Sequence, residues 1–146
     1  MNAAFGTDLS LNMVNICPEL YSKHKISFMG IEAIDLSTFN LCDYFEKCSQ
    51  FMDNSLNEGG HLVSFHCFSF IYWCFHFSGN ILVHCKQGIS RSATLVLSFL
   101  MLKRGLTVEE SVRIVRQNRE IHPNDGFLSQ LCFLNDKLEE QKPIDL

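Results

Sequence analysis

The chain has 146 residues, room for one domain, and its 47% hydrophobic and 19% charged residues are typical of a globular protein rather than a disordered one. A net charge of −4 argues against a surface that neutralises nucleic-acid phosphates. The cysteine count is odd, at seven, and no basic-then-apolar leader follows Met1, which argues against a secreted disulfide scaffold. We therefore expect reduced thiols and a cytoplasmic location, with the nucleus as a second compartment.

The first half of the chain predicts a strand, a helix and a second strand. Residues 26–33 carry branched and aromatic apolar side chains among non-helical signals, which favours a strand. Asn40 opens a helix with apolar residues at three- and four-residue steps, and Gly59-Gly60 ends it. Residues 81–83 are wholly apolar, as is typical of a strand that is buried on both faces.

The second half predicts helices. Residues 92–104 are apolar on nearly every side, which indicates a helix in the centre of the core that ends at Gly105. A capping box over residues 107–110 opens a helix towards Asn118, and a turn at residues 123–126 precedes a last amphipathic helix. This order predicts one α/β domain over residues 1–146, with a central sheet flanked by helices.

A segment rich in aromatic residues does not fit this pattern. No Asp, Glu, Lys or Arg occurs between Gly59 and Cys85, a length that permits a membrane span. Histidines, serines and Gly79-Asn80 interrupt it, so we expect no span, although the alternative stays open. Four residues could be drawn as zinc ligands, but they lack the usual Cys-x-x-Cys spacing, and we expect no metal: His66, Cys67, Cys74 and His76.

The informative stretch is Val-His-Cys-Lys-Gln-Gly-Ile-Ser-Arg-Ser, residues 83–92, between the predicted buried strand and the central helix. A strand-to-helix turn directs several backbone N–H groups at one point, where the helix dipole adds positive charge. We therefore predict a phosphate-binding cradle made by Lys86, Gln87, Gly88, Ile89, Ser90 and Arg91. Arg91 offers a planar fork of donors for two phosphate oxygens, and Gly88 lets the amides converge.

Cys85 is the candidate nucleophile, because the loop amides and the guanidinium of Arg91 favour its thiolate. Ser92 can donate a hydrogen bond to the sulfur, and His84 can brace the loop from behind. A lone cysteine after an apolar strand is usually a small core residue, but the combination with Gly, Ser and Arg at this spacing disfavours that interpretation. A hydrolase nucleophile elbow would need glycine at position 92, and no Gly-Lys-Ser/Thr pattern supports nucleotide hydrolysis.

His84-Cys85-x5-Arg91-Ser92 resembles the signature of the cysteine-dependent protein tyrosine phosphatases. Residues 31–46 and 81–138 are similar to the small VHR-type atypical dual-specificity phosphatases. The resemblance implies a protein tyrosine phosphatase-like fold and hydrolysis of phosphotyrosine, phosphoserine and phosphothreonine through a cysteinyl phosphate. It implies no cofactor or metal, and phosphorylated proteins as partners, mitogen-activated protein kinases among them.

The resemblance also implies roles for residues outside the loop. Asp35 matches the general acid that protonates the leaving oxygen, against the alternative of an ordinary solvated loop aspartate. Arg119 matches a position that contacts a second phosphate on the substrate, against the alternative of a solvated arginine at a helix end. The resemblance further implies that Asn124 helps to fix the surroundings of the site, but a helix N-cap explains this residue sufficiently.

Two departures from the family leave alternatives open. The resemblance begins at Met1-Asn2-Ala3-Ala4, which matches a position well inside the domain, so we expect a fold that is incomplete at its start. The spacing from Tyr44 to Cys85 is too long, and we interpret residues 61–79 as an insertion, a translated intron. The alternatives are a genuine insert for docking or membrane attachment, and an inactive or phosphate-binding product of a truncated gene.

Overall fold

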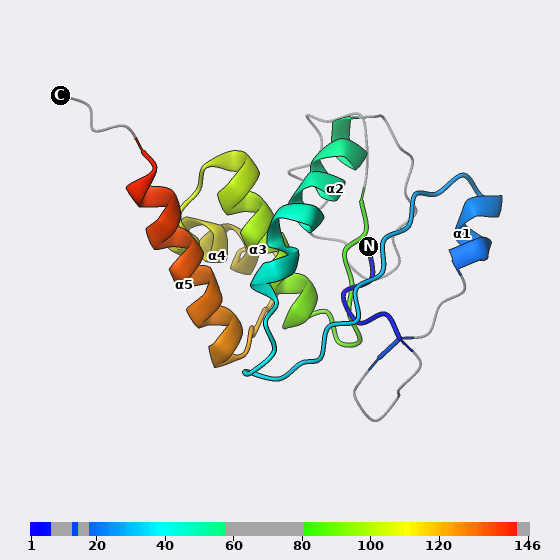
Figure 1. The fold of residues 1–146 in the computed structure, drawn as a ribbon, viewed down its shortest axis with the longest axis horizontal. Helices are drawn as coiled ribbons and strands as arrows, with labels where there is room; N and C mark the ends of the chain where they lie inside the picture. The colour runs from blue at the N-terminus through cyan, green and yellow to red at the C-terminus, as the bar shows by residue number, and fades with distance from the viewer. Residues whose placement is uncertain (7–12, 15–17, 58–80, 143–146) are drawn as a thin grey trace.

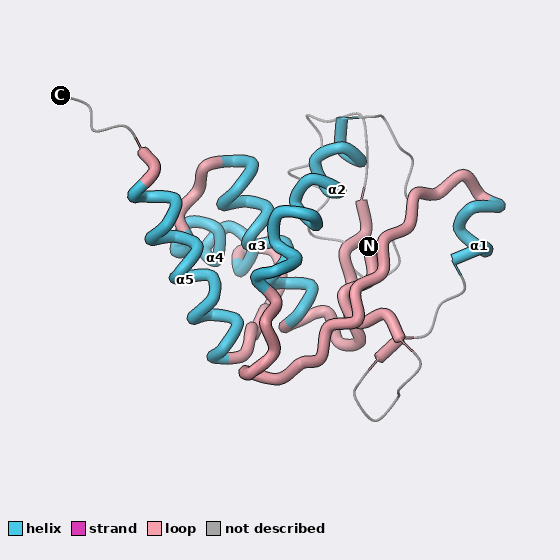
Figure 2. Tube along the Cα trace, viewed as in Figure 1, coloured by secondary structure: helices cyan, strands magenta, loops and turns pink. Residues whose placement is uncertain are grey.

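The computed structural model describes residues 1–6, 13–14, 18–57 and 81–142. Its helices, in chain order, are α1 (Pro18–Lys23), the 3-10 turn η2 (Cys42–Tyr44), α2 (Phe45–Asn57), α3 (Arg91–Arg104), α4 (Val108–Arg116) and α5 (Asp125–Glu140). Figure 1 shows α2 to α5 gathered on one side of the molecule and α1 at the opposite edge. Extended segments, drawn as loops in Figure 2, fill the space between them.

Three extended segments run in parallel, with the start of the chain in the middle. Asn2 forms parallel bridges to Gly30 on one side and to His84 on the other. The amide of Ala3 donates to the carbonyl of His84 at 2.7 Å, and the amide of Ile31 donates to the carbonyl of Asn2 at 2.9 Å. These contacts join the two segments predicted as strands, although the described residues pair only as isolated bridges and none forms a longer strand.

Helix α3 lies at the centre of the core, as its sequence predicts. It packs against α2, α4 and α5. Leu95, Leu97 and Leu100 are fully buried, and only Val96 and the last three residues of α3 are half-buried. The start of α3 is thereby held firmly, because a helix buried on most sides cannot tilt without breaking contacts on each of them.

The predicted helix ends are mostly confirmed. Gly105 ends α3 in the left-handed conformation at φ +67°, and Thr107 and Glu110 form the reciprocal capping box that opens α4. Asn124 caps α5 by accepting from the amide of Phe127 at 3.0 Å. Helix α4 ends at Arg116, slightly before the predicted Asn118, and α5 begins at Asp125 inside the predicted turn.

The start predicted at Asn40 for the α2 helix is wrong. The chain first forms the 3-10 turn at Cys42–Tyr44, and the α-helix begins at Phe45. The side chain of Gln130 in α5 accepts from the amides of Leu41 and Cys42, each at 2.8 Å. These amides therefore find their partner in another helix, which satisfies them without a regular helical turn at Asn40.

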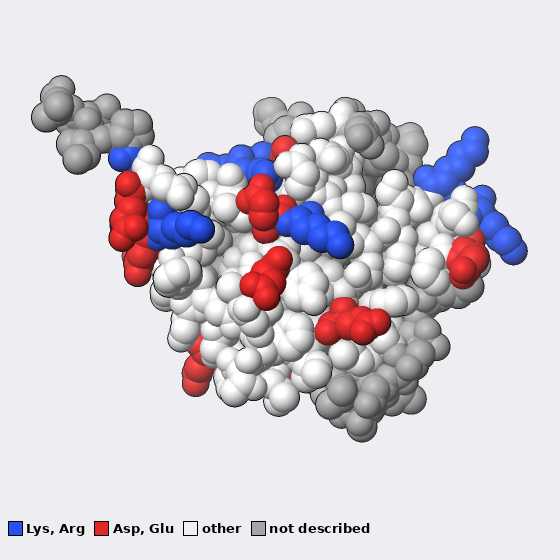
Figure 3. All heavy atoms as spheres, viewed as in Figure 1, with Lys and Arg blue, Asp and Glu red and all other residues white. Residues whose placement is uncertain are grey.

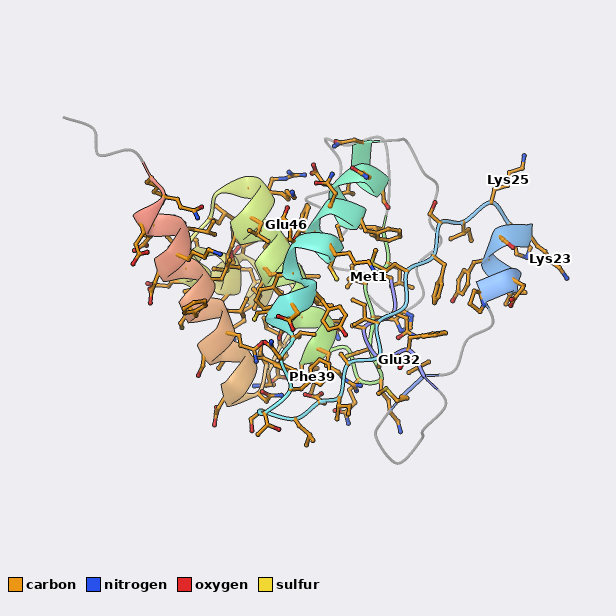
Figure 4. The ribbon with its side chains drawn as sticks, viewed as in Figure 1. Met1, Lys23, Lys25, Glu32, Phe39 and Glu46 are labelled. Carbon is orange, nitrogen blue, oxygen red and sulfur yellow. The ribbon has the colours of Figure 1, made fainter. Side chains whose placement is uncertain are left out.

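Helix α1 was not predicted and lies at the margin of the molecule. None of its residues is buried, and Lys23 and Lys25 point away from the other helices in Figure 4. A stack of Tyr21 on Phe28, with ring centroids 4.9 Å apart, connects this region to the chain that follows.

The predicted insertion at residues 61–79, the Gly59-Gly60 helix stop and the four candidate zinc residues lie outside the described residues. None of the described helices has the length and hydrophobicity of a membrane span. On the face seen in Figure 3, positive and negative side chains are scattered in small groups, so this face offers no continuous basic surface.

Candidate active site

The loop of residues 85–90 connects the bridge at His84 with the first turn of α3. Within it, the amide of Gly88 donates to the Cys85 sulfur at 3.2 Å, which curls the loop around the sulfur. Gly88 has φ +77°, a conformation that side chains rarely adopt, so glycine at this position has the physical reason that the sequence suggested. The hydroxyl of Ser92 donates to the same sulfur at 3.3 Å.

Cys85 is buried, with 6% of its surface exposed, and two opposing effects act on its thiol. Burial raises the pKa and is the largest single effect. The hydroxyl and amide of Ser92, the amide of Gly88 and the charge of Arg91 lower it, and together they bring the pKa of Cys85 below its ordinary value of 9.0. This is the environment that makes a cysteine nucleophilic near neutral pH.

Arg91 is held in place by the segment before α2. Its side chain is only 2% exposed, and Nη1 donates to the carbonyl of Ala33 at 3.0 Å. Nε lies 3.5 Å from Oδ2 of Asp35. A guanidinium fixed in this way keeps its charge at the loop, because it is anchored to backbone and carboxylate oxygens behind it.

Asp35 meets the loop from a distant part of the sequence. The hydroxyl of Ser90 donates to Asp35 Oδ1 at 2.7 Å, and Nδ2 of Asn124 donates to the same oxygen at 3.0 Å. The Asp35 side chain keeps 28% exposure, so it is reachable from solvent. The structure therefore brings together Cys85, Arg91 and Asp35 with the loop that connects the first two.

Arg119 lies against the loop at Gly88. A Cβ atom at Gly88 would come within 2.7 Å of Nη2 of Arg119, so the guanidinium rests on the glycine. The amide of His122 donates to the carbonyl of Ile89 at 2.8 Å and ties the same segment to the loop. Arg119 is thus a half-buried cation beside the cradle and not a solvated arginine at the end of α4.

The remaining predicted residues line the same loop. Nδ1 of His84 lies 3.3 Å from the Cys85 carbonyl, and burial lowers the pKa of the His84 imidazole, which favours its neutral form. Lys86 and Gln87 are exposed at the rim. No group of three or more His, Cys, Asp or Glu side chains that could hold a metal ion occurs in the described part of the chain.

The sequence interpretation undervalued two residues. For Asn124 the helix cap was taken as the sufficient explanation over a role near the site, but its side chain also donates to Asp35. Gln130 was not singled out, yet it accepts from two amides and donates to the carbonyl of Phe39 at 2.8 Å, joining α5 to the chain that follows Asp35. The Pro-Asn-Asp-Gly turn at residues 123–126 was a signal that could have pointed to Asn124. Nothing in the sequence near Gln130 distinguishes it from a surface glutamine.

Comparisons with known proteins agree with this geometry. The dual specificity phosphatase catalytic-domain family matches residues 65–137, half of the chain. Dual specificity protein phosphatase 26 of Bos taurus and of Homo sapiens are each 37% identical over 123 residues, which is 84% of this chain and 50% of theirs. The chain therefore spans about half the length of these curated relatives.

Solved structures share the fold. A mouse putative dual specificity phosphatase, complexed with zinc tungstate, is 25% identical with a TM-score of 0.64, covering 80% of this chain and 62% of its own. Human DUSP28 is 25% identical with a TM-score of 0.59, covering 76% of this chain and 63% of its own. Because the family match extends over the loop, α3 and α4 and most of α5, this chain belongs to the dual specificity phosphatase catalytic-domain family, with its protein tyrosine phosphatase-like α/β fold.

Proposed function

We propose that this chain hydrolyses phosphotyrosine and phosphoserine or phosphothreonine in proteins through a cysteinyl phosphate. The observation that carries the proposal is the Cys85 sulfur, which accepts hydrogen bonds from Gly88 and Ser92 and whose pKa lies below the ordinary value. A thiolate that accepts several hydrogen bonds, with the fixed guanidinium of Arg91 at the start of α3, has the arrangement needed to attack phosphorus.

In the first step the Cys85 thiolate forms the S–P bond while the P–O bond to the leaving oxygen breaks. The loop amides and Arg91 hold the equatorial oxygens, and Asp35 gives its proton to the leaving oxygen. In the second step water attacks phosphorus, Asp35 takes the proton from that water, and the S–P bond breaks. The hydroxyl of Ser92 stabilises the departing thiolate by the hydrogen bond that it already donates.

Loop residues share the binding of the phosphate. The backbone N–H groups of Lys86, Gln87, Gly88, Ile89 and Ser90 form the cradle, and His84 braces it through the Cys85 carbonyl. The mouse putative dual specificity phosphatase was solved as a complex with zinc tungstate, and tungstate is a tetrahedral oxyanion like phosphate. The chemistry as written needs no cofactor or metal.

The test is hydrolysis of phosphotyrosine and phosphothreonine peptides by this chain, compared with Cys85→Ser and Cys132→Ser. We expect Cys85→Ser to abolish turnover, because serine is not ionised at neutral pH. Cys132 lies exposed on α5, so its substitution should leave turnover unchanged. Tungstate binding by a chain that hydrolyses neither peptide would overturn the proposal and favour a phosphate-binding protein.

Arg119 gives the site a means to prefer doubly phosphorylated substrates, such as a mitogen-activated protein kinase. Its guanidinium lies beside Gly88 and can contact a second phosphate near the first. Arg119→Ala should raise KM several-fold for a doubly phosphorylated kinase peptide and much less for a singly phosphorylated one. Arg116→Ala is the matched control, because Arg116 is exposed at the end of α4. An equal change in KM for both peptides would contradict this role.

A reducing compartment fits this chemistry, so we place the protein in the cytoplasm and the nucleus. Cys42, Cys48, Cys85 and Cys132 are free thiols among the described residues. A disulfide at Cys85 would remove the nucleophile, whereas glutathione in these compartments keeps thiols reduced. Fluorescence imaging of the tagged chain in cells tests this location, and a secretory or membrane signal would overturn it.

A further inference from the structure

We propose that Asn124 is a positioning residue that holds the carboxyl group of Asp35 against the 85–90 loop. The inference rests on the proposed function, because Asp35 is the general acid of that reaction. Asn124 itself touches no reacting atom in this scheme. It acts through Asp35, by directing where the proton is delivered.

The side chain of Asn124 makes two hydrogen bonds in opposite directions. Its Oδ1 atom accepts from the amide of Phe127 at 3.0 Å, and its Nδ2 atom donates to Oδ1 of Asp35 at 3.0 Å. The amide group cannot rotate by half a turn without losing the cap of α5, since nitrogen would then face the Phe127 amide. The helix cap therefore ensures that Asn124 presents a donor to Asp35.

The second donor to Asp35 also comes from a helix end. Ser90 occupies the N-cap position of α3, but its side chain gives no capping hydrogen bond there. Its hydroxyl donates to Asp35 Oδ1 at 2.7 Å instead. Two donors, from the beginnings of α3 and α5, thus meet at one carboxylate oxygen, while Arg91 faces the other oxygen at 3.5 Å. Ser90 and Arg91 belong to the 85–90 loop and the residue that follows it, whereas Asn124 comes from a separate part of the chain.

The backbone after Asp35 is attached to the same helix turn. A Cβ atom at Gly126 would collide with the carbonyl of Ser37, so these two backbones are in direct contact. Ser37, two residues after Asp35, therefore lies on the first turn of α5 whether or not the Asn124 side chain donates. Loss of that donor should loosen the Asp35 carboxyl group, which would keep only its contacts with Ser90 and Arg91, while leaving the neighbouring backbone in place.

The substitution Asn124→Asp separates capping from positioning. Aspartate is as good an N-cap as asparagine, so α5 should keep its start. It has no N–H group, however, and sets a second carboxylate against Asp35. Asn135→Asp is the matched control on the same helix, because the Asn135 side chain only accepts a hydrogen bond there, from the Val108 amide.

The experiment measures kcat and KM with phenyl phosphate and with p-nitrophenyl phosphate, which share a shape and differ in leaving group. A misplaced general acid matters most for phenyl phosphate, because phenoxide is a poorer leaving group than p-nitrophenoxide and needs the proton more. We expect Asn124→Asp to lower kcat for phenyl phosphate roughly tenfold or more, with a much smaller change for p-nitrophenyl phosphate and with KM nearly constant. Asn135→Asp should match the unmodified chain on both esters.

The possible outcomes separate the two proposals. An unmodified chain that hydrolyses neither ester overturns the proposed function, and the role of Asn124 with it. An active chain in which Asn124→Asp changes nothing, or slows both esters equally, overturns the positioning role alone. Asn124→Ser keeps a capping oxygen but is too short to reach Asp35, and it decides the question by the same ratio of rates if Asn124→Asp does not fold.

Discussion

The region around the 85–90 loop and the region around α1 differ in how they are held. The loop lies between a paired segment and a buried helix, and Ser90, Arg91 and Ser92 are all buried. Helix α1 buries none of its residues, and its Leu20 is 55% exposed. A loop that must aim several donors at one anion needs rigid supports on each side, whereas a marginal helix can be short and exposed.

The first prediction compares one leucine from each region. Leu131 in α5 is fully buried, and Leu131→Ala should lower the free energy of unfolding by about 2–5 kcal/mol, through lost burial and the cavity left behind. Leu20→Ala in exposed α1 should change it by at most ~0.5 kcal/mol. Denaturant unfolding of the two variants measures both values. Equal losses would show that α1 is as integral to the fold as α5.

The second prediction compares two acidic residues on one segment. Asp35→Asn removes the acid that contacts the loop and should slow hydrolysis of phenyl phosphate roughly a hundredfold, about 2.7 kcal/mol in activation free energy. Glu32→Gln changes an exposed carboxylate nearby and should leave the rate unchanged. Steady-state kinetics on both variants give the comparison, and similar rates would exclude Asp35 as the acid.

The third prediction compares two glycines with positive φ. Gly88→Ala adds backbone strain and a methyl group against Arg119, so it should reduce both stability and kcat/KM. Gly105→Ala adds similar strain in open space and should cost only about 1 kcal/mol of stability. Thermal unfolding and hydrolysis rates distinguish the two. A loss of activity in Gly105→Ala as large as in Gly88→Ala would contradict a specific role of Gly88.

The smallest effect concerns pH. Because the pKa of Cys85 in the folded chain is below 9.0, its alkylation by iodoacetamide should reach half its maximal rate at a lower pH than an ordinary thiol requires. The same shift stabilises the fold above the unfolded-state pKa, and that contribution is lost as pH falls through the folded pKa. At pH 7 the thiolate fraction of Cys85 should therefore exceed that of an unshifted cysteine. Peptide mapping after alkylation at several pH values measures this, and an unshifted profile would contradict the thiolate assignment.

Several elements were predictable because their signals are local. The caps at Gly105 and Thr107 depend on residues within one or two turns, and the buried faces of α3 follow from its apolar sequence. The start of α2 was not predictable in the same way. The amides of Leu41 and Cys42, just before it, are satisfied by Gln130, nearly ninety residues later, and no feature near Asn40 reveals that partner.

For the candidate site, the sequence alone determined the spacing of Cys85 and Arg91 and the turn between them, because only five residues separate the two and Gly88 among them allows a tight turn around the sulfur. Only the tertiary structure decided that Ser90 and Asn124 donate to the same oxygen of Asp35. Ser90 lies 55 positions after Asp35, and Asn124 lies 89 positions after it. The physical reason is that their meeting depends on how α3 and α5 pack together and on the close backbone contact at Gly126. Packing of this kind depends on the whole core rather than on any neighbouring residues.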